Sequence, residues 1–270
     1  MRKLILLIFL TSISALSQQQ IKEDIETYHQ NGYTFPSYHI LQATDHSIEK
    51  LESDVKDASI FEVNKIALNA IYQTQPLLIQ FSFPFKGEMV NIELYKKNPT
   101  EESFRTFIQN EEKLLIKPGV HYRGVIANSS RSIASFNFYN NSFYGVASSV
   151  ELGNINVGKI KDQHEYIVYA EQDIKGKNSF ECRYEEMTKN IEQTIEKQVS
   201  STESNLTTNN CVRIYYKVAY EPYLQNNSNI SQTVNWLTAI HNNISTLYAN
   251  DGINIALSEV MVWTEPDPYI

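Results

Sequence analysis

The feature that most constrains the fold is a series of short segments rich in β-branched and aromatic residues, which recur at spacings of about ten residues with turn residues between them. Such a series is typical of a β-sandwich or barrel. The predicted strands are Leu77–Phe83, Glu88–Tyr95, His121–Ala127, Ser132–Tyr139, Phe143–Ser148, Asn154–Ile160 and Glu165–Ala170. The first two flank Pro84–Gly87 and predict a hairpin. Residues 59–182 are therefore expected to form an all-β domain, sandwich- or barrel-like.

The C-terminal residues 211–270 follow a different pattern. Alternating side chains predict a strand over residues 212–220. Apolar residues at three- and four-residue steps then predict an amphipathic helix, with Ser231 as N-cap and Gly252 as its left-handed stop. A second strand follows. The apolar helix positions are Val234, Leu237, Ile240, Ile244, Leu247 and Tyr248, and the side chains expected on one face of the second strand are Ile253, Ile255, Leu257, Met261 and Trp263.

Strand, helix and strand in this order predict a βαβ unit with parallel pairing. Two strands and one helix cannot bury a core alone, so residues 211–270 are interpreted as an incomplete domain. The overall class is α+β, with the all-β domain followed by this partial α/β unit. Residues 183–210 are rich in polar side chains and are interpreted as a linker. Residues 18–58 have a weak pattern with one short helical stretch, Ser47–Val55.

The first residues predict export. Arg2 and Lys3 precede the apolar run Leu4–Leu10, and small residues at Ala15–Ser17 favour signal-peptide cleavage before Gln18. Residues 1–17 are therefore assigned to a signal peptide, and the protein is expected to be secreted. No later stretch is apolar enough to span a bilayer, so no membrane contact is expected after cleavage. A net charge of −8 argues against nucleic acid as a partner.

The chain carries no nucleophile elbow, phosphate-binding loop or dinucleotide fingerprint. His164-Glu165 resembles the start of the HExxH zinc motif, but the fifth position is Val168 and the segment is predicted as a strand. The other histidines lack ligand spacing on a helix, and His241 is interpreted as a core or boundary residue. They are His29, His39, His46, His121 and His241. No catalytic or metal-binding residue is predicted within this chain.

Two segments resemble the precursors of reprolysin-like (adamalysin or ADAM-type) metzincin zinc metalloproteases, of the bacterial secreted type. The first is similar to their propeptide, through His121–Val125, Ser132–Phe136, Tyr144–Val146, Asn154–Val157 and His164–Tyr169. The second is similar to the start of their catalytic domain, through Arg213–Val218, Val234-Asn235, Ile244–Tyr248, Gly252–Leu257, Val262-Trp263 and Asp267. The resemblance covers roughly residues 75 to 270 and keeps the order of the two parts.

The resemblance implies that the full-length protein is a zymogen whose propeptide folds and inhibits its own catalytic domain, and whose substrates are polypeptides. It places the zinc-binding motif HExxHxxGxxH beyond residue 270. Three histidines would hold the zinc, and the glutamate would act as general base on the bound water. This chain alone is expected to be inactive. The alternative is a secreted β-rich binding or inhibitory module without a catalytic half.

The two cysteines leave two alternatives open. Cys182 lies where family propeptides carry a thiolate that replaces the zinc-bound water, although Arg183 stands where the family usually has glycine. Cys182 and Cys211 could instead form a disulfide that closes a loop of about 30 residues and contributes ~3 kcal/mol. Cys182 is thus the candidate switch residue, with the Cys182–Cys211 bridge as the alternative.

Overall fold

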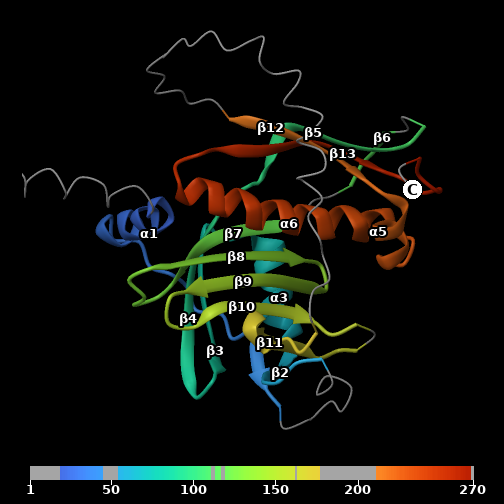
Figure 1. Cartoon of the computed structure of the whole chain (residues 1–270). Coiled ribbons are helices and arrows are strands. Elements are labelled where there is room, and N and C mark those ends of the chain that lie inside the picture. Colours follow the sequence, from blue (N-terminus) through green and yellow to red (C-terminus); the bar gives the residue numbers. More distant parts are fainter. Residues whose placement is uncertain are drawn as a thin grey trace, which may run out of the picture.

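The computed structural model describes residues 19–44, 54–110, 113–116, 119–161, 163–176 and 211–268. The predicted signal peptide, Cys182, the predicted linker and nearly all of the predicted helical stretch 47–55 lie outside the described residues. The described part is mostly β-structure, arranged as two sheets with one long helix between them (Figure 1). The helices are α1 (Gln20–Gln30), α3 (Lys65–Thr74), α5 (Tyr220–Gln225) and α6 (Ile230–Asn250), with a 3-10 turn at Glu171–Asp173.

The larger sheet, sheet A, is antiparallel and has nine strands in the order β1-β2-β11-β10-β9-β8-β7-β4-β3 among the described residues. Segment 36–38 precedes β1 and hydrogen-bonds to Gln80 of β3, the opposite edge strand, so the sheet is nearly closed into a barrel. The strands are β1 (Leu41–Ala43), β2 (Ala58–Val63), β3 (Leu78–Phe85), β4 (Glu88–Lys96), β7 (Val120–Ile126), β8 (Ser132–Tyr139), β9 (Ser142–Ser149), β10 (Gly153–Lys159) and β11 (Tyr166–Ala170). Each of the seven predicted strands is confirmed within two residues.

The hairpin turn is tighter than the sequence predicted. Strand β3 continues through Pro84 and Phe85, and only Lys86 and Gly87 form the turn, with φ of 50° and 83°. Positive φ at both central residues matches the twist of the paired strands, and glycine adopts it without steric cost. Proline is tolerated in β3 because this strand lies at the end of the sheet order.

The core of sheet A is aromatic. Phe81, Phe136 and Phe143 are fully buried, and the Phe138 and Phe143 rings stack with centroids 5.6 Å apart. Helix α3 packs Leu68 and Ile71 into the same cluster and so covers the inner face of the sheet. The side chains of β7 and β8 that alternate with this core point to the outer face, where α1 and α6 lie.

The smaller sheet, sheet C, combines strands from both parts of the chain. Its order is β12 (Val212–Val218), β13 (Ile255–Val262), β5 (Thr100–Ile108) and β6 (Lys113–Leu114). Strands β12 and β13 pair in parallel, as the sequence predicted for the βαβ unit. Strand β5 also pairs in parallel with β13, although β5 and β6 belong to the range 59–182. The β-rich region thus supplies the strands that the C-terminal unit needs to bury its core.

The C-terminal elements differ from the predictions in three details. Asn229 caps α6, its side chain accepting from the Gln232 amide at 3.0 Å, so the predicted cap Ser231 is wrong. The first strand ends at Val218, because Tyr220 begins the unpredicted helix α5. The third difference concerns β13, whose register shifts after Leu257.

This shift changes which side chains of β13 face α6. Leu257, Val260 and Val262 share the core cluster, whereas Met261 was predicted to share a face with Leu257. An extra residue in a strand reverses the alternation beyond it. Ser258 occupies the irregularity and donates to the Ile214 carbonyl at 2.8 Å.

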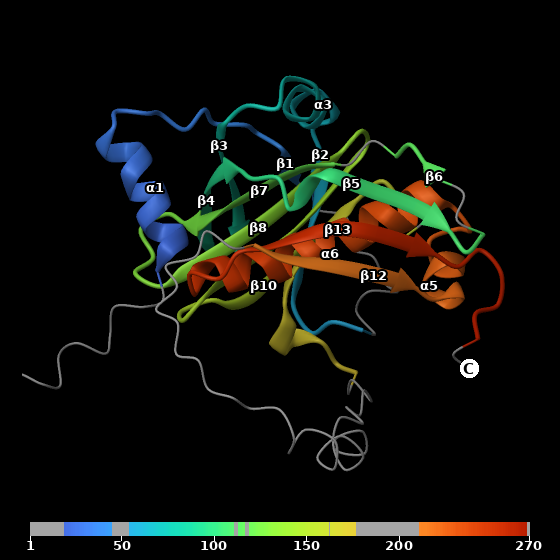
Figure 2. The same cartoon turned by 90° about the horizontal axis from the view of Figure 1, so that it is seen from above.

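Figure 1 shows α6 between sheet C and sheet A, and Figure 2, seen from above, shows sheet C lying over α6. Helix α3 packs on the inner face of sheet A. Helix α1 lies beside one end of α6 on the same outer face. Contacts of α6 with β8 and β7 on one side and with β13 on the other agree with this arrangement. The helix is therefore the element that joins the two parts of the molecule.

Candidate functional site

The densest group of buried polar side chains lies where α6 meets the outer face of sheet A. Helix α6 contributes residues at three- and four-residue steps, and sheet A contributes alternate residues of β7 and β8, so each set shares one face. We call this set the α6–sheet interface. Its members are Asn235, Thr238, Asn242, Ser245 and Ala249 from α6, and His121, Arg123, Ser135, Asn137 and Tyr139 from sheet A.

Asn242 is the central residue of this interface and is fully buried. Its side-chain amide donates to Ser135 Oγ and to Asn137 Oδ1, both at 2.9 Å. Near one end of the helix, the Tyr139 hydroxyl donates to the Asn235 carbonyl at 2.7 Å. These bonds join α6 directly to β8, and each replaces a hydrogen bond that water would otherwise make.

Arg123 is the buried cation of the interface, with only 4% of its surface exposed. Its Nη2 donates to Ser245 Oγ on α6 at 2.7 Å. Burial lowers the pKa of Arg123, and the nearby Tyr95 and Asp24 oppose that shift. Tyr95 in turn donates to the Asp24 carboxylate at 2.6 Å. A charge held with few compensating groups makes the interface costly to form and sensitive to neighbouring charge.

Two histidines lie near Arg123: His121 belongs to the α6–sheet interface, and His241 lies beside it on α6 and faces β12 of sheet C. His121 Nδ1 lies 2.8 Å from Asn137 Oδ1, and His241 Nδ1 lies 3.4 Å from the Tyr216 hydroxyl of β12. Burial is the main reason that the pKa of each histidine is lowered to about 4. Both are therefore neutral at pH 7. The interpretation of His241 as a core residue is confirmed, because it is fully buried.

Polar contacts also join β5 to the C-terminal unit on sheet C. Gln109 exchanges hydrogen bonds with Thr264, through Nε2 to Oγ1 at 3.0 Å and from the Thr264 amide to Oε1 at 3.0 Å. Two ion pairs cross the same boundary, Arg105 with Glu259 and Arg213 with Glu101 at 2.8 Å. The partly exposed ion pairs add little stability, so the strand ladder and the core beneath it dominate this contact.

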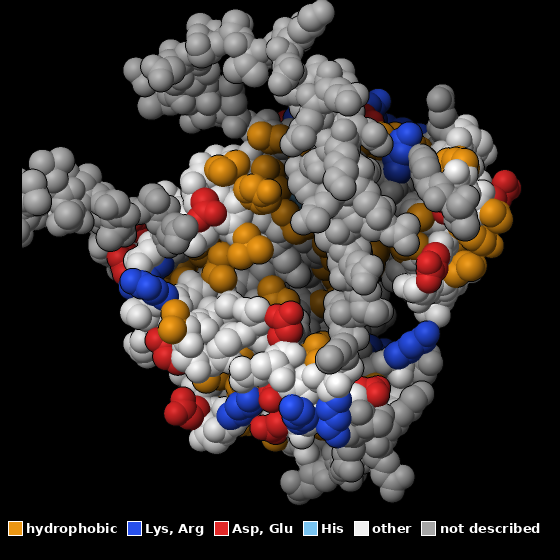
Figure 3. Space-filling view, viewed as in Figure 1, with side chains coloured by type: hydrophobic (Ala, Val, Ile, Leu, Met, Phe, Trp, Pro, Cys, Tyr) orange, Lys and Arg blue, Asp and Glu red, His pale blue; other side chains and the backbone are white. Residues whose placement is uncertain are grey.

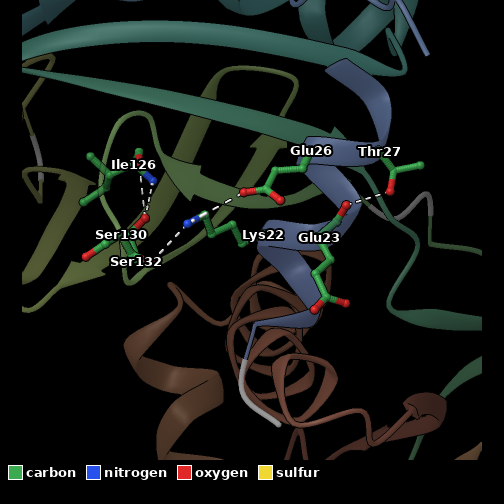
Figure 4. Close-up of polar contacts among 7 residues, drawn as sticks. All are labelled: Lys22, Glu23, Glu26, Thr27, Ile126, Ser130 and Ser132. Atoms are coloured by element: carbon green, nitrogen blue, oxygen red, sulfur yellow. Dashed lines mark hydrogen bonds and ion pairs between the residues drawn. The ribbon is translucent and has the colours of Figure 1, made fainter. Parts of the chain in front are cut away.

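An open hollow of about 590 Å³ lies between α1 and sheet A. His29 Nε2 lies 3.0 Å from Glu93 Oε2 at its wall. Figure 4 shows Lys22 reaching from α1 to the Ser130 carbonyl at 3.4 Å and to Glu26 at 3.7 Å. The His29–Glu93 pair has no hydrogen bond to a serine or cysteine among the described residues.

The residues singled out from the sequence do not converge. His164 is exposed, and its amide donates to the Glu165 carboxylate at 3.0 Å. Cys211 is exposed and has no disulfide partner within the described ranges, which exclude Cys182. In the part of the chain that the structure describes, no three His, Cys, Asp or Glu side chains are grouped to hold a metal ion.

Sequence reasoning missed the α6–sheet interface. It expected the apolar positions of α6 to mark the buried face, yet Leu247 and Tyr248 are 58% and 46% exposed while Asn242 is buried. The signal was present as a second repeat of small and polar residues, from Asn235 to Ala249. This polar repeat was not recognised because a polar face of a helix is ordinarily exposed, and it is buried only where another element supplies hydrogen-bond partners for it.

The surface shows where apolar side chains remain outside the core. Figure 3 shows hydrophobic side chains gathered in the upper half of one face, over α6 and the C-terminal strands, with positive and negative side chains interspersed elsewhere. Helix α6 exposes three large apolar side chains, Trp236, Leu247 and Tyr248. None of the helices that the structure describes combines the length and apolar character needed to cross a bilayer.

The comparisons with known proteins leave the site without a precedent to transfer. Neither a family model nor a curated protein matches this chain.

Proposed function

We propose that this chain is the N-terminal portion of a secreted zinc metalloendopeptidase zymogen. In this proposal residues 18–182 act as a propeptide that folds and inhibits the protease, and the catalytic domain begins near residue 211. Polypeptides are the substrates. In this proposal the zinc ligands lie in an HExxHxxGxxH motif beyond residue 270, as the resemblance to metzincin precursors implies.

The observation that carries the proposal is the character of the α6–sheet interface. Both faces are polar: Asn242 and Ser245 on α6 meet Ser135, Asn137 and Arg123 on sheet A. Two parts that stay together permanently usually bury apolar surface, whereas contacts that must open are more polar. Each of these faces could be hydrated after separation. A removable propeptide requires this property.

The pairing of β5 with β13 supports the folding role. An added strand satisfies the backbone groups along the exposed edge of β13 and closes the core under sheet C. The Leu257 amide donates to the Pro99 carbonyl at 2.9 Å at the start of this ladder. The β-rich region therefore provides a template on which a βαβ unit can fold, as a propeptide would for its protease.

The test is to express the complete reading frame that contains this chain and to assay peptide cleavage. The proposal expects a latent protein that becomes an endopeptidase after cleavage within residues 183–210, with activity lost on chelation and restored by zinc. The uncut protein is the control. Activity that survives chelation, or a reading frame without a zinc site, would refute the proposal.

The role of Cys182 can be decided in the same preparation. A Cys182→Ala variant should raise the activity of the uncut zymogen if the thiolate holds the zinc. If Cys182 and Cys211 are bridged, alkylation before reduction should leave both unmodified, and C182A should not relieve latency. Intact mass measured with and without reduction distinguishes the two alternatives.

A secreted binding or inhibitory module is the second candidate. The exposed apolar side chains of α6, Trp236, Leu247 and Tyr248, favour it, because apolar groups gathered on a surface often mark interaction sites. On this reading the chain would bind an exogenous protein without any proteolytic activity of its own. The activity assay above separates the two candidates.

A further inference from the structure

We propose that acidification opens the contact between α6 and sheet A, through protonation of His121 and His241 beside the buried Arg123. The inference rests on the proposed function, in which sheet A belongs to the propeptide and α6 to the part that must be released. It adds a trigger: cleavage of the linker would leave the two parts associated at neutral pH, and a fall in pH would separate them.

The geometry places one histidine on each side of the contact. His121 projects from β7 on sheet A, and His241 projects from α6; they are 2% and 0% exposed. His121 Nδ1 faces Asn137 Oδ1 at 2.8 Å, so Nδ1 carries the proton in the neutral ring and Nε2 does not. The Nε2 atom is buried without a hydrogen-bond partner among the described residues.

Protonation of His121 would therefore create a buried N–H donor with no acceptor. It would also add a positive charge near Arg123, which is buried on the same strand. Protonation of His241 would add a further positive charge near Arg123, whose own charge already lowers the pKa of His241. An unpaired buried charge is far more costly than a neutral polar group. Separation of the two faces would return all three groups to water.

Among the described residues, the groups that act on the two histidines include no carboxylate. His241 of α6 faces the hydroxyl of Tyr216 on β12. The backbone at Pro99 partly opposes the lowering of the pKa of His241. On β7 and β8, His121 is faced by Asn137 and by the Tyr139 ring. From β4 and α1, Tyr95 and Asp24 act on Arg123, but neither histidine has a carboxylate among the groups that shift its pKa.

The direction of the pH effect follows from these shifts. Both histidines have a pKa lowered from 6.5 to about 4 in the closed state. Release of the C-terminal unit would remove α6 from His121 and remove Arg123 and the Pro99 backbone from His241, so the pKa of each ring would move toward its ordinary value. The open state then binds more protons than the closed state between pH 6.5 and 4, so falling pH favours opening across this window. The neutral histidines therefore stabilise the closed state fully above pH 6.5, and this stabilisation is lost as the pH falls through 4.

The experiment uses the whole chain with a site for a specific protease inserted within residues 183–210. After cleavage, the two fragments are followed by analytical ultracentrifugation between pH 7.5 and 4.5. We expect one complex at pH 7.5 and a dissociation constant at least about tenfold higher at pH 5. A dissociation constant that stays unchanged between pH 7.5 and pH 5 overturns the proposal.

Two variants assign the effect. His121→Asn with His241→Asn removes both titrating rings, and Asn at position 121 can still donate to Asn137; the fragments should then stay together at pH 5. His164→Asn is the matched control, because His164 is exposed and far from α6 in the chain. It should dissociate like the unsubstituted chain. Equal dissociation of the double variant and the control would overturn the assignment.

A second measurement keeps the inference testable if the double variant does not fold. Proton NMR of the uncut chain, labelled at histidine, reports the pKa of each ring directly. A pKa near 6.5 for either His121 or His241 overturns the proposal. Fragments that fail to associate even at pH 7.5 refute the proposed propeptide role, whereas association that ignores pH refutes only the trigger.

Discussion

Gly124 lies in the segment His121–Val125, one of those that resemble metzincin propeptides, and the packing of β7 on β4 explains why it is glycine. A Cβ at this position would collide with the backbone carbonyl of Glu93 on the neighbouring strand. Gly145 is similar, because a Cβ there would collide with the Phe136 ring. Both glycines permit a close approach between strands of sheet A. Their role is structural and needs no ligand.

This packing predicts the effect of adding a single methyl group. Gly124→Ala should lower the free energy of unfolding by about 3 kcal/mol or more, because a backbone carbonyl must move. Gly158→Ala in β10 is the control: its Cβ would lie 3.7 Å from the nearest atom, an ordinary contact. Urea unfolding followed by circular dichroism measures both. Equal stability of the two variants would contradict the assigned packing.

Asn242 is the residue of α6 whose contribution is easiest to isolate. Asn242→Ala removes its hydrogen bonds to Ser135 and Asn137 and should cost about 2 kcal/mol. Asn243→Ala is the matched control, because the same substitution changes helix propensity equally. Asn243 is half-buried, and its side-chain oxygen has no hydrogen-bond partner among the described residues. Thermal or urea unfolding should show a loss for Asn242→Ala only. A similar loss for both variants would mean that Asn242 contributes only through helix propensity.

At the scale of elements, the sequence predicted seven of the nine described strands of sheet A, missed β1 and β2, and predicted the faces of the C-terminal elements poorly. Strand β4 shows why such strands are predictable: Val90, Ile92 and Leu94 alternate along it and all enter the aromatic core. Strand β5, by contrast, was not predicted, because the charged residues Glu101, Glu102 and Arg105 dilute its apolar signal. Pairing between segments this far apart depends on tertiary contacts that local pattern does not encode.

Dependence on tertiary contacts also explains why sequence reasoning missed the α6–sheet interface. In β13 one irregularity near Ser258 reverses the alternation, and no residue type near it announces that change. In α6 the apolar repeat predicted the helix correctly, but the polar repeat through Asn242 decided which face meets sheet A. The helix was thus predictable and the interface was not.

The position of β5 inside sheet C predicts the effect of breaking its ladder. Thr106 is 2% exposed and pairs with Val260 on one side and Leu114 on the other. Thr106→Pro removes a ladder donor from an internal strand and should cost about 3 kcal/mol or more. Hydrogen exchange should show lost protection in β12 and β13, while Thr106→Val keeps it. Unchanged protection in Thr106→Pro would argue against the pairing.

For the whole molecule, the buried histidines make stability depend on pH even without cleavage. Between pH 7 and pH 4 the uncut chain should lose about 2–5 kcal/mol, because unfolding restores the ordinary pKa of His121 and His241 from about 4. The sign is fixed by the lowered pKa: the unfolded chain binds more protons in this range. Urea unfolding at a series of pH values measures it. A stability that is flat across this range would contradict the burial of neutral rings.

In the proposed zymogen, residues 18–182 provide the surface on which the C-terminal unit folds. The most direct measurement is refolding of a 211–270 fragment from denaturant, alone and with an 18–182 fragment, followed by hydrogen exchange of β13 and α6. The account predicts that the short fragment alone exchanges at unfolded rates and gains protection only with its partner, through β5 and the α6–sheet interface. A short fragment that is equally protected alone would contradict it.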